Sequence, residues 1–145
     1  MIYWDTSAII KLYVEESDSA LWEKVAMDER HPRVSSMLLE AEFSFAVRQK
    51  EQRGEVKPGG AAHLVKMLRR DVTRGYLQLY PLNAEVMTRT VELALHEAKH
   101  VPMRTLDGLH LASALLLDTR LIATADVRMK AAALRVGLAL VDPTD

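Results

Sequence analysis

Short apolar segments alternate along this chain with longer amphipathic ones. The first, Met1-Ile2-Tyr3-Trp4, is a run of β-formers that stops at Asp5-Thr6-Ser7, and helical spacing of apolar positions follows from Ala8 to Val14. A short apolar run that ends at an acid and passes into helical periodicity predicts a buried strand feeding a helix. Asp5 is therefore expected at the carboxyl end of a strand.

The same alternation continues to the end of the chain. Further strands are expected at 33–36, 76–80, 121–124 and 138–141, and further helices at about 18–29, 37–53, 58–73, 83–100, 105–117 and 126–136. Strands that alternate with helices predict an α/β fold of three layers, a parallel sheet with helices on both faces. No internal repeat or long linker divides residues 1–145, so we expect a single domain.

Length, charge and cysteine content narrow the class of protein. A chain of 145 residues can bury one core, and its net charge of −1 gives no global field that would attract nucleic acid, so such recognition must be local. With no cysteine there are no disulfides or thiolate metal sites. The N-terminus lacks a basic, signal-like region, and no apolar run approaches the roughly 20 residues of a membrane span. We therefore expect a cytoplasmic protein with no membrane association.

Three aspartates are predicted where strands end or helices begin. Asp5 follows the first strand, Asp126 follows the strand at 121–124, and Asp107 lies in the first turn of the helix that starts near Thr105. Each alone has a structural explanation, because Asp caps helix N-termini and favours the positive end of the helix dipole. In a parallel sheet, however, the carboxyl ends of the strands share one edge, and ligands bind there.

Glu42 is the fourth candidate acid. On a helical wheel it is surrounded by Leu38, Leu39, Phe45 and Ala46, and a charge within an apolar stripe is costly unless it is paired. A buried ion pair with Arg or Lys is the alternative explanation. Glu40, by contrast, is predicted on a mixed edge of the same helix that water reaches.

Taken together, the four acids point to a cation. Several carboxylates at one edge repel one another, and a divalent cation is the usual reason for such a cluster. Oxygen ligands without cysteine or a compact histidine cluster favour Mg²⁺ or Mn²⁺ over Zn²⁺. Such a site suits phosphoryl chemistry.

The sequence resembles the PIN-domain ribonucleases, and most closely the VapC-type toxins of prokaryotic toxin–antitoxin pairs. The resemblance is carried by Ile2-Tyr3-Trp4-Asp5-Thr6-Ser7, Ser36-Met37-Leu38-Leu39-Glu40-Ala41-Glu42, Leu106-Asp107-Gly108-Leu109-His110-Leu111-Ala112 and Thr124-Ala125-Asp126. It implies that Asp5, Glu42, Asp107 and Asp126 form the catalytic site and hold Mg²⁺ or Mn²⁺ for cleavage of RNA phosphodiesters. Gly108 and Met129 depart from the residues common in the family.

The resemblance has further implications. Thr6, Ser7 and Thr124 would lie in a second shell that holds ligands or waters, although they can equally be helix caps. The partners would be an RNA substrate and a cognate antitoxin protein whose tail inserts a basic side chain among the acids. A homodimer is also implied, and large apolar groups such as Leu12, Tyr13 and Trp22 are candidates for its surface.

A basic segment is the candidate RNA-binding surface. From residue 48 to residue 74 there are eight Lys or Arg and three acids, a local balance of 8 − 3 = +5. Two helices in this region can present a basic stripe to a phosphate backbone, with Arg48, Arg53, Lys66, Arg69 and Arg70 as the contacts. A solvated helix face is the alternative.

Two histidine patterns point elsewhere. His96-Glu97-Ala98-Lys99-His100 matches the H-E-x-x-H pattern of zinc proteases, but no downstream third ligand has the required spacing. We expect a solvated helix end there. His110 is flanked by apolar residues and is expected as a core histidine bonded to an oxygen.

The sequence therefore predicts a PIN-like domain that cleaves RNA with Mg²⁺ or Mn²⁺. The alternative function is a catalytically silent PIN-like module that binds RNA or protein.

Overall fold

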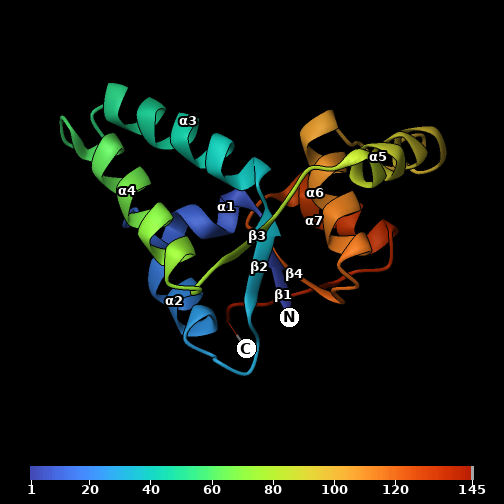
Figure 1. Cartoon of the computed structure of the whole chain (residues 1–145), viewed down its shortest axis with the longest axis horizontal. Helices are drawn as coiled ribbons and strands as arrows, with labels where there is room; N and C mark the ends of the chain where they lie inside the picture. Colours follow the sequence, from blue (N-terminus) through green and yellow to red (C-terminus); the bar gives the residue numbers. More distant parts are fainter. Residues whose placement is uncertain (145) are drawn as a thin grey trace.

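Five short parallel strands form the centre of the molecule (Figure 1). The computed structural model describes residues 1–144. The strands are β1 (Ile2–Trp4), β2 (Arg33–Ser36), β3 (Gln78–Tyr80), β4 (Leu121–Ala123) and β5 (Ala139–Leu140), in the order β3-β2-β1-β4-β5. Every neighbouring pair is parallel, with Ile2 opposite Arg33 on one side of β1 and opposite Leu121 on the other. The predicted parallel sheet is confirmed.

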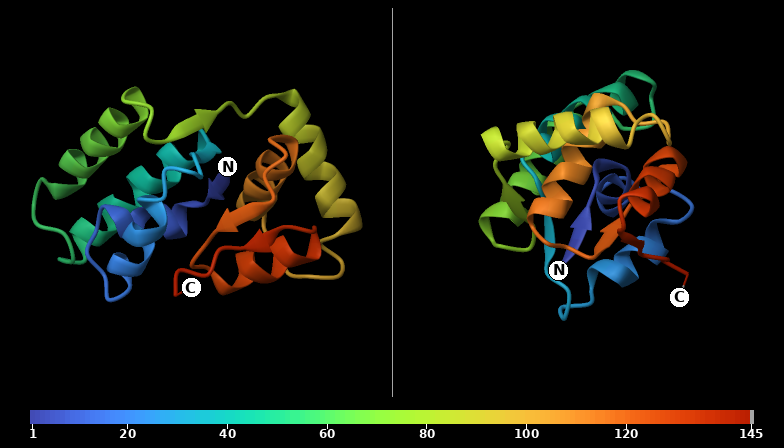
Figure 2. Two further views of the ribbon diagram at one scale, coloured as in Figure 1. Left: turned by 90° about the horizontal axis from the view of Figure 1, so that it is seen from below. Right: turned by 90° about the vertical axis from the view of Figure 1, so that its right-hand side faces the viewer.

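Helices cover both faces of the sheet (Figures 1 and 2). One layer contains α1 (Thr6–Ile9) with its 3-10 extension η1 (Ile10–Leu12), α2 (Ser19–Ala26), α3 (Leu38–Gln52) and α4 (Gly60–Thr73). The other contains α5 (Ala84–His96), α6 (Thr105–Leu116) and α7 (Val127–Arg135). The fold is thus the three-layer α/β/α arrangement that the sequence predicted.

The pleat of β1 divides the core into two parts. Successive strand residues point to opposite faces, so Ile2 and Trp4 pack beneath α1 to α4, while Tyr3 packs beneath α5 to α7. Tyr3 and Trp4 are fully buried. Burial on both faces explains why the first strand is a continuous apolar run.

The predicted helix ends are mostly correct. Gly54, Gly75 and Gly137 follow α3, α4 and α7 with φ of 78°, 79° and 90°, the left-handed conformation that ends helices and that glycine adopts without strain. Two helices end earlier than predicted, because α2 ends at Ala26 and not near residue 29, and α5 ends at His96 and not near His100. The H-E-x-x-H segment therefore does not lie on one helix, and it lacks the geometry of the zinc proteases.

Two predictions about buried apolar faces are wrong. The buried stripe of α3 is Leu39, Phe43 and Val47, whereas Phe45, which was predicted beside Glu42 in the stripe, is 72% exposed. Trp22, proposed for a dimer surface, is only 2% exposed because it packs edge-to-face on Trp4. Leu12 and Tyr13 are likewise packed against the core.

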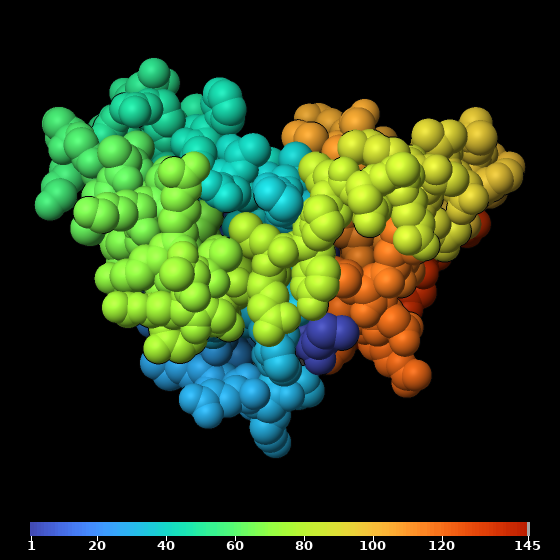
Figure 3. Space-filling model, viewed as in Figure 1, coloured from blue at the N-terminus to red at the C-terminus, as the bar shows by residue number. Residues whose placement is uncertain are grey.

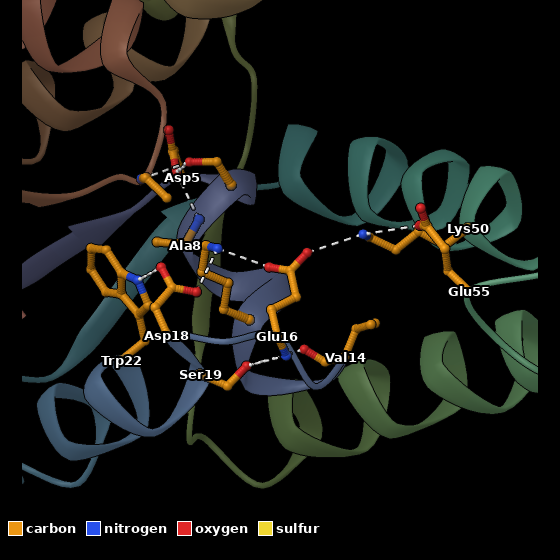
Figure 4. Close-up of polar contacts among 12 residues, drawn as sticks. Asp5, Ala8, Val14, Glu16, Asp18, Ser19, Trp22, Lys50 and Glu55 are labelled. Atoms are coloured by element: carbon orange, nitrogen blue, oxygen red, sulfur yellow. Dashed lines mark hydrogen bonds and ion pairs between the residues drawn. The ribbon is translucent and has the colours of Figure 1, made fainter. Parts of the chain in front are cut away.

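A network of charges ties the end of η1 to α2 and α3 (Figure 4). Lys11 contacts Glu16 and Asp18, both at 2.8 Å, and Glu16 also contacts Lys50 of α3 at 3.1 Å. Because these groups are partly shielded from water, the network stabilises the turn that joins η1 to α2. The hydrogen bond from Lys11 is the main cause of a lowered pKa for Glu16.

Glu16→Gln should lower the free energy of unfolding by about 0.5–1 kcal/mol at neutral pH and low salt. Since the pKa of Glu16 is lowered in the folded state, its contribution is present above the unfolded pKa of about 4.3 and is lost as pH falls. Urea unfolding of wild type and variant at pH 7 and pH 3 measures the difference. Glu15→Gln, the same change at the exposed neighbouring residue, is the control, and an equal effect there would contradict this account.

Within residues 1–144, no helix combines the length and the apolarity that crossing a bilayer requires.

Candidate active site

The order of the strands creates a crevice above β1 and β4. The chain leaves β1 toward β2 on one side and returns later to β4 on the other, so the carboxyl ends of these two strands flank a switch point. Asp5 directly follows β1, and Asp126 lies in the turn between β4 and α7. The sheet thus brings together two acids that are far apart in sequence.

A cavity of about 420 Å³ lies at this edge, and the surface is hollowed between α3 and α6 (Figure 3). It is lined by the four predicted acids, Asp5, Glu42, Asp107 and Asp126, together with Thr6, Ser7, Arg104, Thr105, Leu106, His110, Arg128 and Met129. The four candidate acids therefore converge on one cavity from four separate segments of the chain.

Asp5 is the most deeply buried of the acids. Its Oδ1 accepts hydrogen bonds from the Ser7 hydroxyl at 2.7 Å and from the backbone N–H of Ala8 at 3.2 Å, and its Oδ2 accepts from Thr124 at 2.6 Å. Burial raises the pKa of Asp5, and these hydrogen bonds only partly oppose the rise. A carboxylate in this position gains from a nearby cation.

Asp126 and Asp107 sit at the N-termini of α7 and α6. Asp126 Oδ1 accepts from the backbone N–H groups of Arg128 and Met129, at 2.8 and 3.2 Å, as a helix cap. Asp107 Oδ2 accepts from the backbone N–H of Arg104 and from Nε of Arg128, both at 2.9 Å. The predicted placement of both acids at helix starts is confirmed.

Glu42 reaches the cavity from α3. Its Oε1 accepts from the Thr6 hydroxyl at 2.8 Å and contacts Nε2 of His110, whose Nδ1 lies 2.7 Å from the Tyr3 hydroxyl. Because a carboxylate only accepts, Nε2 of His110 is the donor in its contact with Glu42. Burial raises the pKa of Glu42, but His110 and Thr6 outweigh it, so the net shift is downward.

Three of the acids keep one carboxylate oxygen that can bind a cation. The hydrogen bonds to Glu42, Asp107 and Asp126 all go to one oxygen of each group, namely Oε1, Oδ2 and Oδ1. Within residues 1–144, the second oxygen of each is without such a bond. An all-oxygen donor set of this kind fits Mg²⁺ or Mn²⁺. In the same part of the chain, no three His, Asp or Glu side chains are already arranged as a metal site.

The three hydroxyl residues bond to the acids, but the helix caps are Asp5 for α1 and Asp126 for α7. Ser7 and Thr124 bond Asp5 directly, lie 3.2 Å from each other, and accept backbone N–H groups from Ala125 and Asp126. Thr6 bonds Glu42 and begins α1. They fix the orientation of the acids while also closing the turn after β4.

Three other residues of the cavity were not predicted as part of the site. His110 is the expected core histidine, 3% exposed, but it also faces the cavity through Glu42. Arg104 and Arg128 bring positive charge among the acids. Arg128 follows Asp126 by two residues. A single basic residue at this spacing gives no sign in the sequence of whether it contacts an acid or is solvated.

The predicted RNA-binding residues lie outside the cavity, on the α3–α4 pair. Four of them face acids on the surface: Arg48 with Glu51, Arg53 with Glu55, Arg69 with Glu40, and Arg70 with Asp71. Lys66 is exposed on α4. Glu40 is therefore a partly exposed surface partner, as the mixed edge predicted.

Comparison with known proteins shows the family to which the chain belongs. Residues 2–134 match the family model described as the PIN domain. Over 145 residues the chain is 34% identical to Ribonuclease VapC46 of Mycobacterium tuberculosis, covering 99% of this chain and 98% of the relative.

Solved structures share the fold at low identity. FitAcB from Neisseria gonorrhoeae superposes with a TM-score of 0.70 at 16% identity, covering 99% of both chains. VapC20 of Mycobacterium tuberculosis, described as a toxin that cleaves the sarcin–ricin loop, gives 0.69 at 14% identity over 91% of this chain and 95% of its own. A toxin–antitoxin complex from Klebsiella pneumoniae gives 0.66 at 16% identity over 99% and 98%. The chain belongs to the PIN-domain family, among its VapC-type ribonucleases.

Proposed function

We propose that this protein is a Mg²⁺- or Mn²⁺-dependent endoribonuclease, the toxin of a toxin–antitoxin pair, acting as a single domain. The observation that carries the proposal is the convergence of Asp5, Glu42, Asp107 and Asp126 on one cavity at the switch point of the sheet. The identity with a curated ribonuclease over nearly the whole chain supports the reaction class.

The four carboxylates would hold the cation through oxygen atoms alone. A bound Mg²⁺ or Mn²⁺ would supply polarisation of the scissile phosphate and activation of the attacking water. Asp5 and Asp126 would be direct ligands, and Glu42 and Asp107 would complete the site. Ser7 and Thr124 hold Asp5 in a fixed rotamer, so the acid does not need to reorganise when the cation enters.

The basic stretch would hold the RNA backbone. Arg48 belongs to α3, Arg53 directly follows it, and Lys66, Arg69 and Arg70 belong to α4, while α3 also carries Glu42. Phosphate contacts on that helix would therefore lie on the same rigid element as a catalytic acid. Such contacts give affinity without reading sequence.

A cognate antitoxin is the proposed protein partner. One structure that shares this fold, from Klebsiella pneumoniae, is described as a toxin–antitoxin complex. Expression of the chain alone should slow growth, and co-expression of the adjacent small protein should restore it. Normal growth with abundant, soluble, intact protein would contradict the assignment as a toxin but not the nuclease activity.

We also propose that the protein forms a homodimer. Trp22 is buried and Leu12 and Tyr13 are partly buried, but Met87, Val91 and Leu95 form an exposed apolar stripe on α5, with exposures of 46%, 58% and 64%. Residues four apart lie on one helix face, and such a stripe is costly in water. Light scattering should therefore give twice the chain mass at micromolar concentration, and Val91→Asp should give a monomer. A monomeric wild type at high micromolar concentration would contradict the proposal.

The direct test is cleavage of an RNA panel by purified protein in Mn²⁺, in Mg²⁺ and in EDTA. Metal-dependent cleavage supports the nuclease. RNA or protein binding without cleavage in either ion supports the alternative, a catalytically silent module.

A further inference from the structure

Arg128 is the one cavity residue whose guanidinium is bonded to a predicted cation ligand. Its Nε lies 2.9 Å from Oδ2 of Asp107, and its side chain is 32% exposed while that of Asp107 is 9% exposed. The arginine thus presents its charge to a nearly buried carboxylate that lines the cavity. Its other guanidinium nitrogens have no bond to another residue within 1–144.

The backbone fixes the position of Arg128. Its own N–H donates to Asp126 at 2.8 Å, and this bond is part of the cap that starts α7. The side chain then extends from α7 to Asp107 on α6. One residue therefore links two of the four acids, through its backbone to Asp126 and through its side chain to Asp107.

The contact has two chemical consequences. A cation that binds Asp107 must share that carboxylate with a fixed positive charge or displace it, so Arg128 opposes divalent cation binding. A displaced guanidinium would remain at the cavity mouth, where its planar fork matches the oxygens of a phosphate.

We propose that Arg128 exchanges partners during the reaction, from Asp107 in the cation-free protein to a phosphate of the bound RNA. The inference rests on the proposed nuclease function and adds a phosphate-binding residue within the cavity, distinct from the basic surface of α3 and α4. It predicts that removing the Arg128 guanidinium strengthens cation binding and weakens RNA binding. A purely structural role in holding Asp107 predicts that both kinds of binding change in the same direction.

The first arm of the test uses Mn²⁺ alone, measured by calorimetry without RNA. Arg128→Gln should bind Mn²⁺ at least about tenfold more tightly than the wild type, because the competing charge is gone. Arg135→Gln is the matched control, since it removes the same charge from the other end of α7, where Arg135 pairs with Glu97 at 2.7 Å. Arg135→Gln should bind Mn²⁺ as the wild type does.

The second arm uses cleavage of a fluorescent single-stranded RNA at saturating Mn²⁺. Arg128→Gln should raise KM by about ten- to a hundredfold, the usual effect of losing a charge-assisted hydrogen bond. The dependence of log KM on log salt concentration should also become shallower by about 0.7. Arg128→Lys keeps the charge but not the fork, so its Mn²⁺ affinity should stay near that of the wild type while KM still rises.

Melting curves check that all variants fold. If Arg128→Gln does not fold, Arg128→Lys is used for the test. Unchanged or weaker Mn²⁺ binding by Arg128→Gln, or a KM equal to that of Arg135→Gln, would overturn the inference while leaving the nuclease assignment intact. A wild-type protein that neither binds Mn²⁺ nor cuts RNA would overturn both.

Discussion

Asp5→Asn should raise the melting temperature of the metal-free protein and abolish RNA cleavage. Burial raises the pKa of Asp5, so ionising this carboxyl is less favourable in the folded state than in the unfolded chain. Asn keeps a side-chain oxygen for the cap to Ala8 and removes the charge. The lost cation ligand should reduce cleavage by about a hundredfold or more, since metal stabilisation of the transition state is worth several kcal/mol.

The sign of the stability change depends on pH. A carboxyl whose folded pKa is raised contributes stability below its unfolded pKa of about 3.9 and loses it as pH rises. The advantage of Asp5→Asn should therefore be present at pH 7 and vanish near pH 3. Asp118→Asn is the control, because Asp118 is exposed and its φ of 55° is one that Asn also adopts. An Asp5→Asn protein that melts lower than the wild type at pH 7 would contradict the account of burial.

Phe43→Ala should be the most damaging substitution in α3, with a loss of about 3–5 kcal/mol in the free energy of unfolding. Phe43 is fully buried and packs edge-to-face on Tyr13, with ring centroids 5.3 Å apart. Truncation leaves a cavity between α3 and η1 that the rigid sheet cannot close. Phe45→Ala, on the exposed face of the same helix, should change stability by no more than about 0.5 kcal/mol.

Urea unfolding measures the free energy of unfolding of both variants. It is followed by the fluorescence of Trp4 and Trp22, which are buried in the same part of the core. Equal effects at the two positions, or a larger effect at Phe45, would show that α3 turns a different face to the sheet.

The elements of the fold were predictable because each carries a local signal. Strand ends are set by acids and prolines, and helix ends by glycines that take the left-handed conformation, as at Gly54 and Gly75. The acids were predictable for the same reason, since Asp5 and Asp126 follow strands that the pattern marks clearly. Because the carboxyl ends of parallel strands lie at one edge of the sheet, predicting where a strand ends also predicts where its acid lies.

The orientation of α3 was predicted wrongly because Phe45 was grouped with Glu42 on the apolar face. Leu39, Phe43 and Val47 repeat every four residues, and this is the face that is buried, with Phe43 packed on Tyr13. Trp22 was misjudged because its partner Trp4 is distant in sequence. Arg128 and His110 contact acids that are distant in sequence or on another helix, so their contacts could not be predicted from the residues around them.

The most direct test of the central claim is RNA cleavage as a function of Mn²⁺ concentration by the wild type, Asp126→Asn and Asp118→Asn. Asn at position 126 keeps the cap on α7, so the helix and the melting temperature without metal should be preserved. The account predicts saturable, Mn²⁺-dependent cleavage by the wild type and by Asp118→Asn, with none by Asp126→Asn at any concentration. Cleavage by Asp126→Asn at the wild-type rate would contradict the assignment of this cavity as a metal-dependent nuclease site.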